Sequence, residues 1–112
     1  MLDAGCKLIY QPSAAVLHKI DGTRLTPQAL ARRFFRHGRG YGVRLQRSDE
    51  AGRRLCGIPL WVIRLYGELH WEALRSWRSG DADAARWHWL RRHIYRGVMT
   101  QCASDWWRRS SQ

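Results

Sequence analysis

Apolar residues recur with the period of an α-helix between positions 58 and 78. They fall on one face of a helix that is predicted to begin at Pro59, namely Ile58, Trp61, Val62, Leu65, Leu69 and Ala73. Charged residues line the opposite side of the same helix: Arg64, Glu68, Glu72 and Arg75. This segment is therefore predicted to be an amphipathic helix with one apolar side available for packing.

A second helix is predicted to begin at Thr26 and Pro27 and to run through Leu30, Phe34 and Phe35. Threonine is a favoured N-cap residue, and proline is favoured at the first helical position, where its missing N–H is not needed. Glycines follow at positions 38, 40 and 42. Because glycine is a poor helix former, we expect them to end or loosen this helix.

A third helix is predicted over residues 81–98, with Trp87, Leu90, Ile94 and Val98 on its apolar side. Gly80 is expected to stop the preceding helix, and Asp81 is suited to cap this one. Two short strands are predicted upstream, over residues 7–10 and 14–18. The expected fold class is α+β and predominantly α-helical, with a short two-stranded remnant of a sheet followed by about three amphipathic helices.

The chain is strongly basic. Twenty Lys and Arg residues stand against nine Asp and Glu, for a formal net charge of +11, and all the basic residues except Lys7 and Lys19 are arginines. Such a surface attracts nucleic acid, anionic lipid headgroups and pyrophosphates. The arginine bias fits bidentate phosphate binding, and it equally fits a GC-rich genome.

Tryptophan is concentrated beyond residue 60. Trp and Arg together suit a membrane interface or a protein interface, and the candidate interfacial residues are Trp61, Trp71, Trp77, Trp87, Trp89, Trp106 and Trp107. No stretch approaches the ~20 apolar residues that span a bilayer. We expect these helices either to lie on an anionic membrane surface or to pack on another domain.

The three cysteines, Cys6, Cys56 and Cys102, are odd in number and far apart, which argues against a disulfide framework or a zinc site. A reducing compartment is therefore expected. The first residues carry no basic segment followed by an apolar run, so no signal peptide is predicted. The expected location is the cytoplasm, at the inner face of the cell membrane.

Residues 4–18 and 30–40 together resemble family 2 glycosyltransferases of the GT-A type. In that family a helix ends in glycine, a strand leads to proline and small residues, and a second strand ends in histidine. A helix with basic and aromatic residues follows, and then a glycine. Here these features are Gly5, Pro12, His18, the run Arg32-Arg33-Phe34-Phe35-Arg36 and Gly38.

The resemblance implies transfer of a sugar from a nucleotide-sugar donor to a polysaccharide or glycolipid acceptor, in cell envelope polysaccharide synthesis. It implies that residues 1–45 are the C-terminal end of a GT-A domain and residues 46–57 a linker. Residues 58–112 would then be amphipathic helices at the membrane surface. They resemble the family's C-terminal helices, which are often membrane-associated.

The resemblance also implies site residues. His18 would help bind a divalent metal, Mg or Mn, on the donor diphosphate in the full-length enzyme; the alternative is a histidine that closes a strand by hydrogen bonding. Donor or acceptor phosphates would be approached by Arg32, Arg33, Arg36 and Arg39. The alternative for these arginines is a solvated basic helix face.

In the family, the catalytic acidic pair and the metal-binding Asp-x-Asp lie upstream of the glycine that corresponds to Gly5, and neither is present at that place in this sequence. The chain is therefore expected to be a fragment, inactive alone, of an enzyme that acts on a nucleotide-sugar and a glycan or lipid-linked acceptor. The alternative is a basic amphipathic protein that binds a membrane surface or nucleic acid. Nucleic acid is the less expected partner, because no helix-turn-helix, zinc or RNP pattern is found.

Overall fold

The structure, a computed structural model, describes residues 11–13, 25–48 and 52–112. These residues form three helices and one antiparallel hairpin: α1 (Pro27–Arg47), β1 (Arg54–Leu55), β2 (Ile58–Pro59), α2 (Leu60–Arg78) and α3 (Ala82–Ser110). The predicted fold class, predominantly α-helical α+β, is confirmed. The strands predicted over 7–10 and 14–18 lie outside the described residues.

The predicted helix starts are confirmed by their capping contacts. The Thr26 hydroxyl accepts a hydrogen bond from the backbone N–H of Ala29 at 3.2 Å, and Pro27 occupies the first position of α1. The Asp81 carboxylate accepts from the backbone N–H of Ala84 at 3.0 Å. Each side chain satisfies a backbone donor that has no partner within the helix. Gly80, at φ 81°, forms the turn between α2 and α3.

The prediction that three glycines end or loosen the first helix is wrong, because α1 continues through all of them to Arg47. Gly38 and Gly42 are buried, and a Cβ at Gly38 would overlap the backbone carbonyl of Ile94 in α3. Gly97 of α3 lies equally close to the backbone of Phe35. The missing side chains let two backbones approach closely, and this packing outweighs the low helix propensity of glycine.

The observed strand pair was not predicted: β1 lies in the segment 46–57 predicted as a linker, and β2 lies at the start of the segment 58–112 predicted as helices. Arg54 pairs with Pro59 and Leu55 with Ile58, across a two-residue turn in which Cys56 and Gly57 both have positive φ. Positive φ at both turn positions suits the twist of a hairpin. The Arg54 guanidinium also donates to the Leu45 carbonyl at 3.1 Å, which ties the hairpin to the end of α1.

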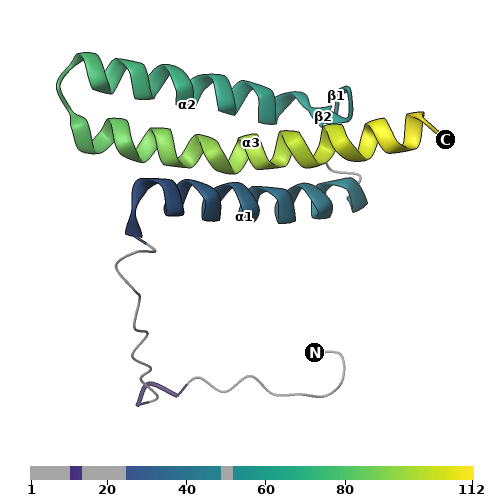
Figure 1. The fold of residues 1–112 in the computed structure, drawn as a ribbon, viewed down its shortest axis with the longest axis horizontal. Helices are drawn as coiled ribbons and strands as arrows, with labels where there is room; N and C mark the ends of the chain where they lie inside the picture. The colour runs from purple at the N-terminus through teal and green to yellow at the C-terminus, as the bar shows by residue number, and fades with distance from the viewer. Residues whose placement is uncertain (1–10, 14–24, 49–51) are drawn as a thin grey trace.

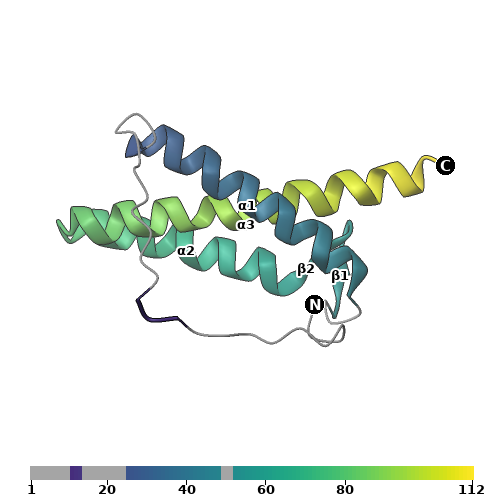
Figure 2. The same ribbon diagram turned by 90° about the horizontal axis from the view of Figure 1, so that it is seen from below.

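Helix α3 is the centre of the fold and packs against both α1 and α2, which lie on opposite sides of it (Figure 1). Figure 2 shows α1 crossing α3 at an angle while α2 runs beside it. The helix extends to Ser110, well beyond the predicted end at residue 98. The arrangement is a row of helices with α3 in the middle.

The core of this row is small. In the described part of the chain, the buried apolar side chains are Leu45, Pro59, Val62, Leu69, Val98 and Cys102. The predicted apolar side of α2 supplies two of them. Trp87, predicted on the apolar side of α3, is instead exposed beneath the guanidinium of Arg91. A core of this size leaves much apolar surface in contact with water.

Candidate functional site

The predicted metal ligand, His18, lies outside the described residues, so its role stays a prediction. Within 11–13, 25–48 and 52–112, no group of three or more His, Cys, Asp or Glu side chains is placed to hold a metal ion. The divalent Mg or Mn that the resemblance implies also stays a prediction.

The four arginines predicted to bind phosphate all lie exposed on α1, a helix with no acidic residue. The helical period places Arg32, Arg36 and Arg39 along one side and turns Arg33 away from it. Arg39 is engaged with α3, since its Nε donates to the Gln101 side-chain carbonyl at 3.0 Å. Of the four arginines, Arg39 is therefore bound to α3, whereas Arg32, Arg33 and Arg36 face the solvent.

The seven tryptophans do not form one surface. Trp61 packs against the core, and the Trp89 ring contacts the His93 ring edge-on, with centroids 4.6 Å apart. Trp71 and Trp77 lie on the last turns of α2. Trp106 and Trp107 lie on the last turns of α3, at the opposite end of the molecule, where the C-terminus is drawn in Figure 1.

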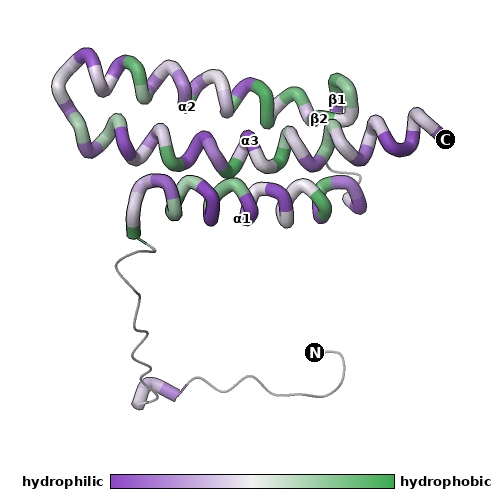
Figure 3. Tube along the Cα trace, in the orientation of Figure 1, coloured by the Kyte–Doolittle hydropathy of each residue, from purple (hydrophilic) through white to green (hydrophobic). Residues whose placement is uncertain are grey.

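A second apolar face runs along α2, away from the side that holds the buried Val62 and Leu69. We call it the outer stripe; its residues follow at intervals of three and four, and they are Leu60, Ile63, Gly67, Trp71 and Leu74. Leu60 and Leu74 are exposed, as is 66% of Trp71. Figure 3 shows hydrophobic positions recurring along the whole of α2.

This stripe was not predicted, because the whole outer side of α2 was expected to carry charged residues. The charged positions, such as Arg64 and Glu68, occupy only one part of that side, and they form an ion pair with each other at 2.8 Å. The spacing of the apolar residues from 60 to 74 was the signal that could have revealed it.

Two hollows border the outer stripe near the α2–α3 turn. One, of about 540 Å³, is lined by Trp71, Leu74, Arg75, Trp77, Arg78 and Ser79. The other, of about 290 Å³, lies between α2 and α3 and includes Leu74, Trp77, Trp89, Arg86 and Arg92. Because Leu74 and Trp77 line both hollows, the apolar surface continues from α2 to α3, and it is bordered by arginines on both helices.

Two buried titratable side chains belong to the packing. Burial lowers the pKa of His93, and the charges of Arg92 and Arg96 lower it further, so the ring is neutral near pH 7. Burial raises the pKa of the Cys102 thiol, more than the neighbouring Gln46 amide and Arg54 lower it. A buried thiol with a raised pKa is a poor nucleophile.

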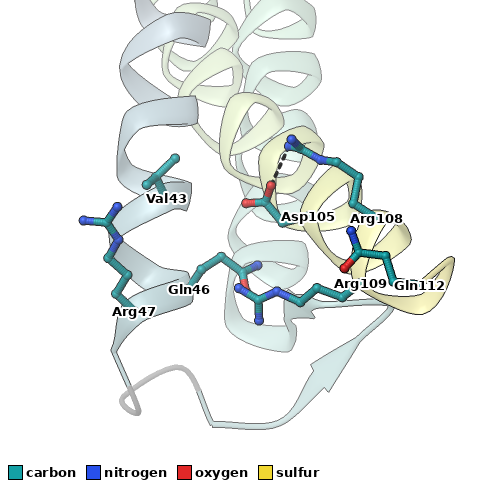
Figure 4. Close-up of a pocket in the computed structure, with 7 residues that line it drawn as sticks. All are labelled: Val43, Gln46, Arg47, Asp105, Arg108, Arg109 and Gln112. Atoms are coloured by element: carbon teal, nitrogen blue, oxygen red, sulfur yellow. Dashed lines mark hydrogen bonds and ion pairs between the residues drawn. The ribbon is translucent and has the colours of Figure 1, made fainter.

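A polar groove lies at the other end of the molecule, between the ends of α1 and α3 (Figure 4). It has a volume of about 310 Å³ and is lined by Val43, Gln46, Arg47, Asp105, Arg108, Arg109 and Gln112. The Arg108 guanidinium donates to the Asp105 carboxylate at 2.7 Å. The sequence analysis did not single out these residues, since they come from two helices distant in the chain.

Comparison with protein-family models, with curated proteins and with solved structures returned no match. None of the helices in the described part of the chain combines the length and the hydropathy needed to cross a bilayer.

Proposed function

We propose that the helical part of this chain binds an anionic membrane surface through the outer stripe of α2. The observation that carries the proposal is that α2 has two apolar faces, of which α3 covers only one. Exposed Trp and Leu side chains on a folded helix suit the boundary between headgroups and acyl chains, where an amphipathic helix lies in the plane of the membrane.

The charges beside the stripe favour anionic lipid. Arg75 and Arg78 flank Trp71 and Leu74 around the larger hollow, and the whole chain carries a formal net charge of +11. Each basic residue near such a surface contributes about 1 kcal/mol of attraction. A second copy of the chain would instead bring two strongly positive molecules together, which disfavours self-association through this face.

Vesicle flotation tests the proposal. The chain is expected to float with vesicles of phosphatidylcholine and phosphatidylglycerol, and to stay behind with phosphatidylcholine alone or at high salt. Trp71→Ala is expected to weaken binding by at least about tenfold, because an interfacial Trp buries on the order of 100 Å² or more of apolar surface.

Trp107→Ala is the matched control, because Trp107 is 68% exposed, close to the 66% of Trp71. The outer-stripe proposal expects less than a twofold change for this variant. Equal losses in the two variants would reject the stripe as the binding face, as would binding that does not depend on anionic lipid. If Trp71→Ala abolished self-association in sedimentation instead, the stripe would be a dimer interface.

We also propose, from the sequence resemblance, that such helices serve as the membrane-surface part of a glycosyltransferase that uses a nucleotide-sugar donor and a glycan or lipid-linked acceptor. What supports this is the order of the two sequence blocks, together with the basic helix α1 at the place of the second. An upstream in-frame sequence that encodes an Asp-x-Asp and an acidic pair would support it. A stop codon directly upstream of Met1 would end it.

A further inference from the structure

We propose that the groove between the ends of α1 and α3 binds a phosphate monoester group. The inference concerns a different surface from the outer stripe and does not rest on the proposed membrane function. At 1.5 Å per residue, Arg108 lies roughly 28 Å along α3 from Trp89, which borders the apolar surface near the α2–α3 turn.

A second hollow, of about 350 Å³, adjoins the groove between the end of α1, the hairpin and α3. Gln46 and Arg109 line both hollows, and Arg54 of the hairpin lines the second. The end of α1 and the hairpin, which are neighbours in sequence, thus come together with the distant end of α3 and bring guanidinium groups to these two adjoining hollows. Guanidinium groups match the oxygen geometry of phosphate and can bind it through paired hydrogen bonds.

The arginines differ in how much they are already engaged. Arg54 donates to the Leu45 carbonyl at 3.1 Å and to the Gln46 side-chain carbonyl at 3.3 Å, so its position is fixed. Arg108 is paired with Asp105. The Arg109 side chain makes no ion pair or hydrogen bond with any described residue, and Figure 4 shows it reaching toward Gln46. Arg109 is therefore the principal free donor.

The charge balance favours a dianion. Across the groove and the adjoining hollow, Arg54, Arg108 and Arg109 stand against Asp105 alone, which leaves two positive charges uncompensated. Arg47 adds another at the outer edge, where Figure 4 shows it pointing away from Gln46. A phosphate monoester carries about −1.5 to −2 at pH 7, whereas a carboxylate carries only one negative charge.

The Asp105 carboxylate would compete with a bound phosphate for the Arg108 guanidinium. It accepts from Arg108 and from the Gln101 amide, at 3.1 Å to each of its oxygens. A bound phosphate would share Arg108 with this carboxylate and would be repelled by it. Removing the charge of Asp105 should therefore strengthen phosphate binding, an effect opposite to that of damage to the fold.

The first test is an NMR titration with inorganic phosphate, following the arginine Nε–Hε signals. Arg109→Gln is expected to weaken binding at least tenfold. Arg64→Gln, which removes the same charge from an exposed ion pair on α2, is the control and should change it less than twofold. Asp105→Asn should tighten binding severalfold, while Asp83→Asn, at a 98% exposed side chain, should not.

The second test asks where the phosphate comes from. The Trp71→Ala background reduces binding through the outer stripe, and vesicles with phosphatidic acid, a phosphate monoester, are compared with vesicles of phosphatidylglycerol, a diester. A preference for phosphatidic acid that Arg109→Gln abolishes assigns the groove to a lipid headgroup. Binding of inorganic phosphate without that preference assigns it to a soluble monoester.

Equal weakening of phosphate binding in Arg109→Gln and Arg64→Gln would overturn the proposal, since only overall charge would then matter. So would the absence of both inorganic phosphate binding and a preference for phosphatidic acid. Neither result bears on the outer stripe, which the comparison of Trp71→Ala with Trp107→Ala tests separately.

Discussion

Replacing Gly38 by alanine places a methyl group against the backbone of α3, whereas the same change at Gly40 meets open space. A Cβ at position 38 would lie 2.7 Å from the carbonyl carbon of Ile94 and would overlap its oxygen, while nothing lies within 4 Å of position 40. Both positions are in the interior of α1, so the gain in helix propensity is the same at each. The two variants are therefore a matched pair that isolates the contact between α1 and α3.

The expected magnitudes follow from these contacts. Ala is favoured over Gly in a helix by about 1 kcal/mol, so Gly40→Ala should raise the free energy of unfolding by up to that amount. At Gly38 the helices must separate by roughly 1 Å, which forfeits up to half of the affected dispersion contacts. Overpacking of this kind costs about 1–3 kcal/mol. Because the obstacle is backbone, the overpacking cost should be near 3 kcal/mol. The gain of about 1 kcal/mol in helix propensity offsets part of this cost, so the free energy of unfolding should fall by about 2 kcal/mol.

Urea denaturation followed by far-UV circular dichroism measures this difference. The two variants should differ by about 3 kcal/mol, and by roughly 12–24 °C in Tm for a domain of this size. Unchanged or increased stability in Gly38→Ala would refute the close approach of α1 and α3. A loss of stability in Gly40→Ala would show that the outer side of α1 is packed.

Three further predictions concern single positions. Burial and two neighbouring arginines lower the pKa of His93. The contribution of the neutral ring to stability is therefore complete above about pH 6.5, and it is lost as pH falls through the lowered pKa. The decrease in the urea midpoint between about pH 7 and pH 5 should be smaller in His93→Gln than in the unchanged chain. Gly57→Ala should lower stability by about 1–3 kcal/mol in thermal melts, because φ is 79° and a Cβ would lie 2.5 Å from that of Trp106. Gly52→Ala, at φ 62° in open space, should lower stability by less. Equal losses of stability in the two variants would contradict the contact between Gly57 and Trp106. Asp81→Ala should lower stability by about 1 kcal/mol through loss of the α3 cap, and no change in its urea midpoint would show that this cap is not stabilising.

The sequence allowed the helix starts and the fold class to be predicted because their signals are local. Thr26 and Asp81 each cap a helix through a backbone N–H three residues ahead, so their neighbours in sequence are sufficient to identify them. The apolar side of α2 that packs on α3 follows in the same way from the helical period. The candidate site was predicted less completely: Trp71 and Trp77 were among the predicted interfacial residues, whereas the leucines of the outer stripe and the arginines of the groove were not predicted as site residues.

Only the tertiary structure decided which residues meet. The glycines of α1 are a helix-breaking signal by propensity, yet at Gly38 the backbone of α3 lies so close that a Cβ would overlap the carbonyl oxygen of Ile94. The hollow beside the groove likewise joins Gln46 and Arg54 to Arg109, which lies more than fifty residues further along the chain. Propensity and capping act within a few residues, whereas the approach of two backbones and the gathering of charges depend on how whole helices pack.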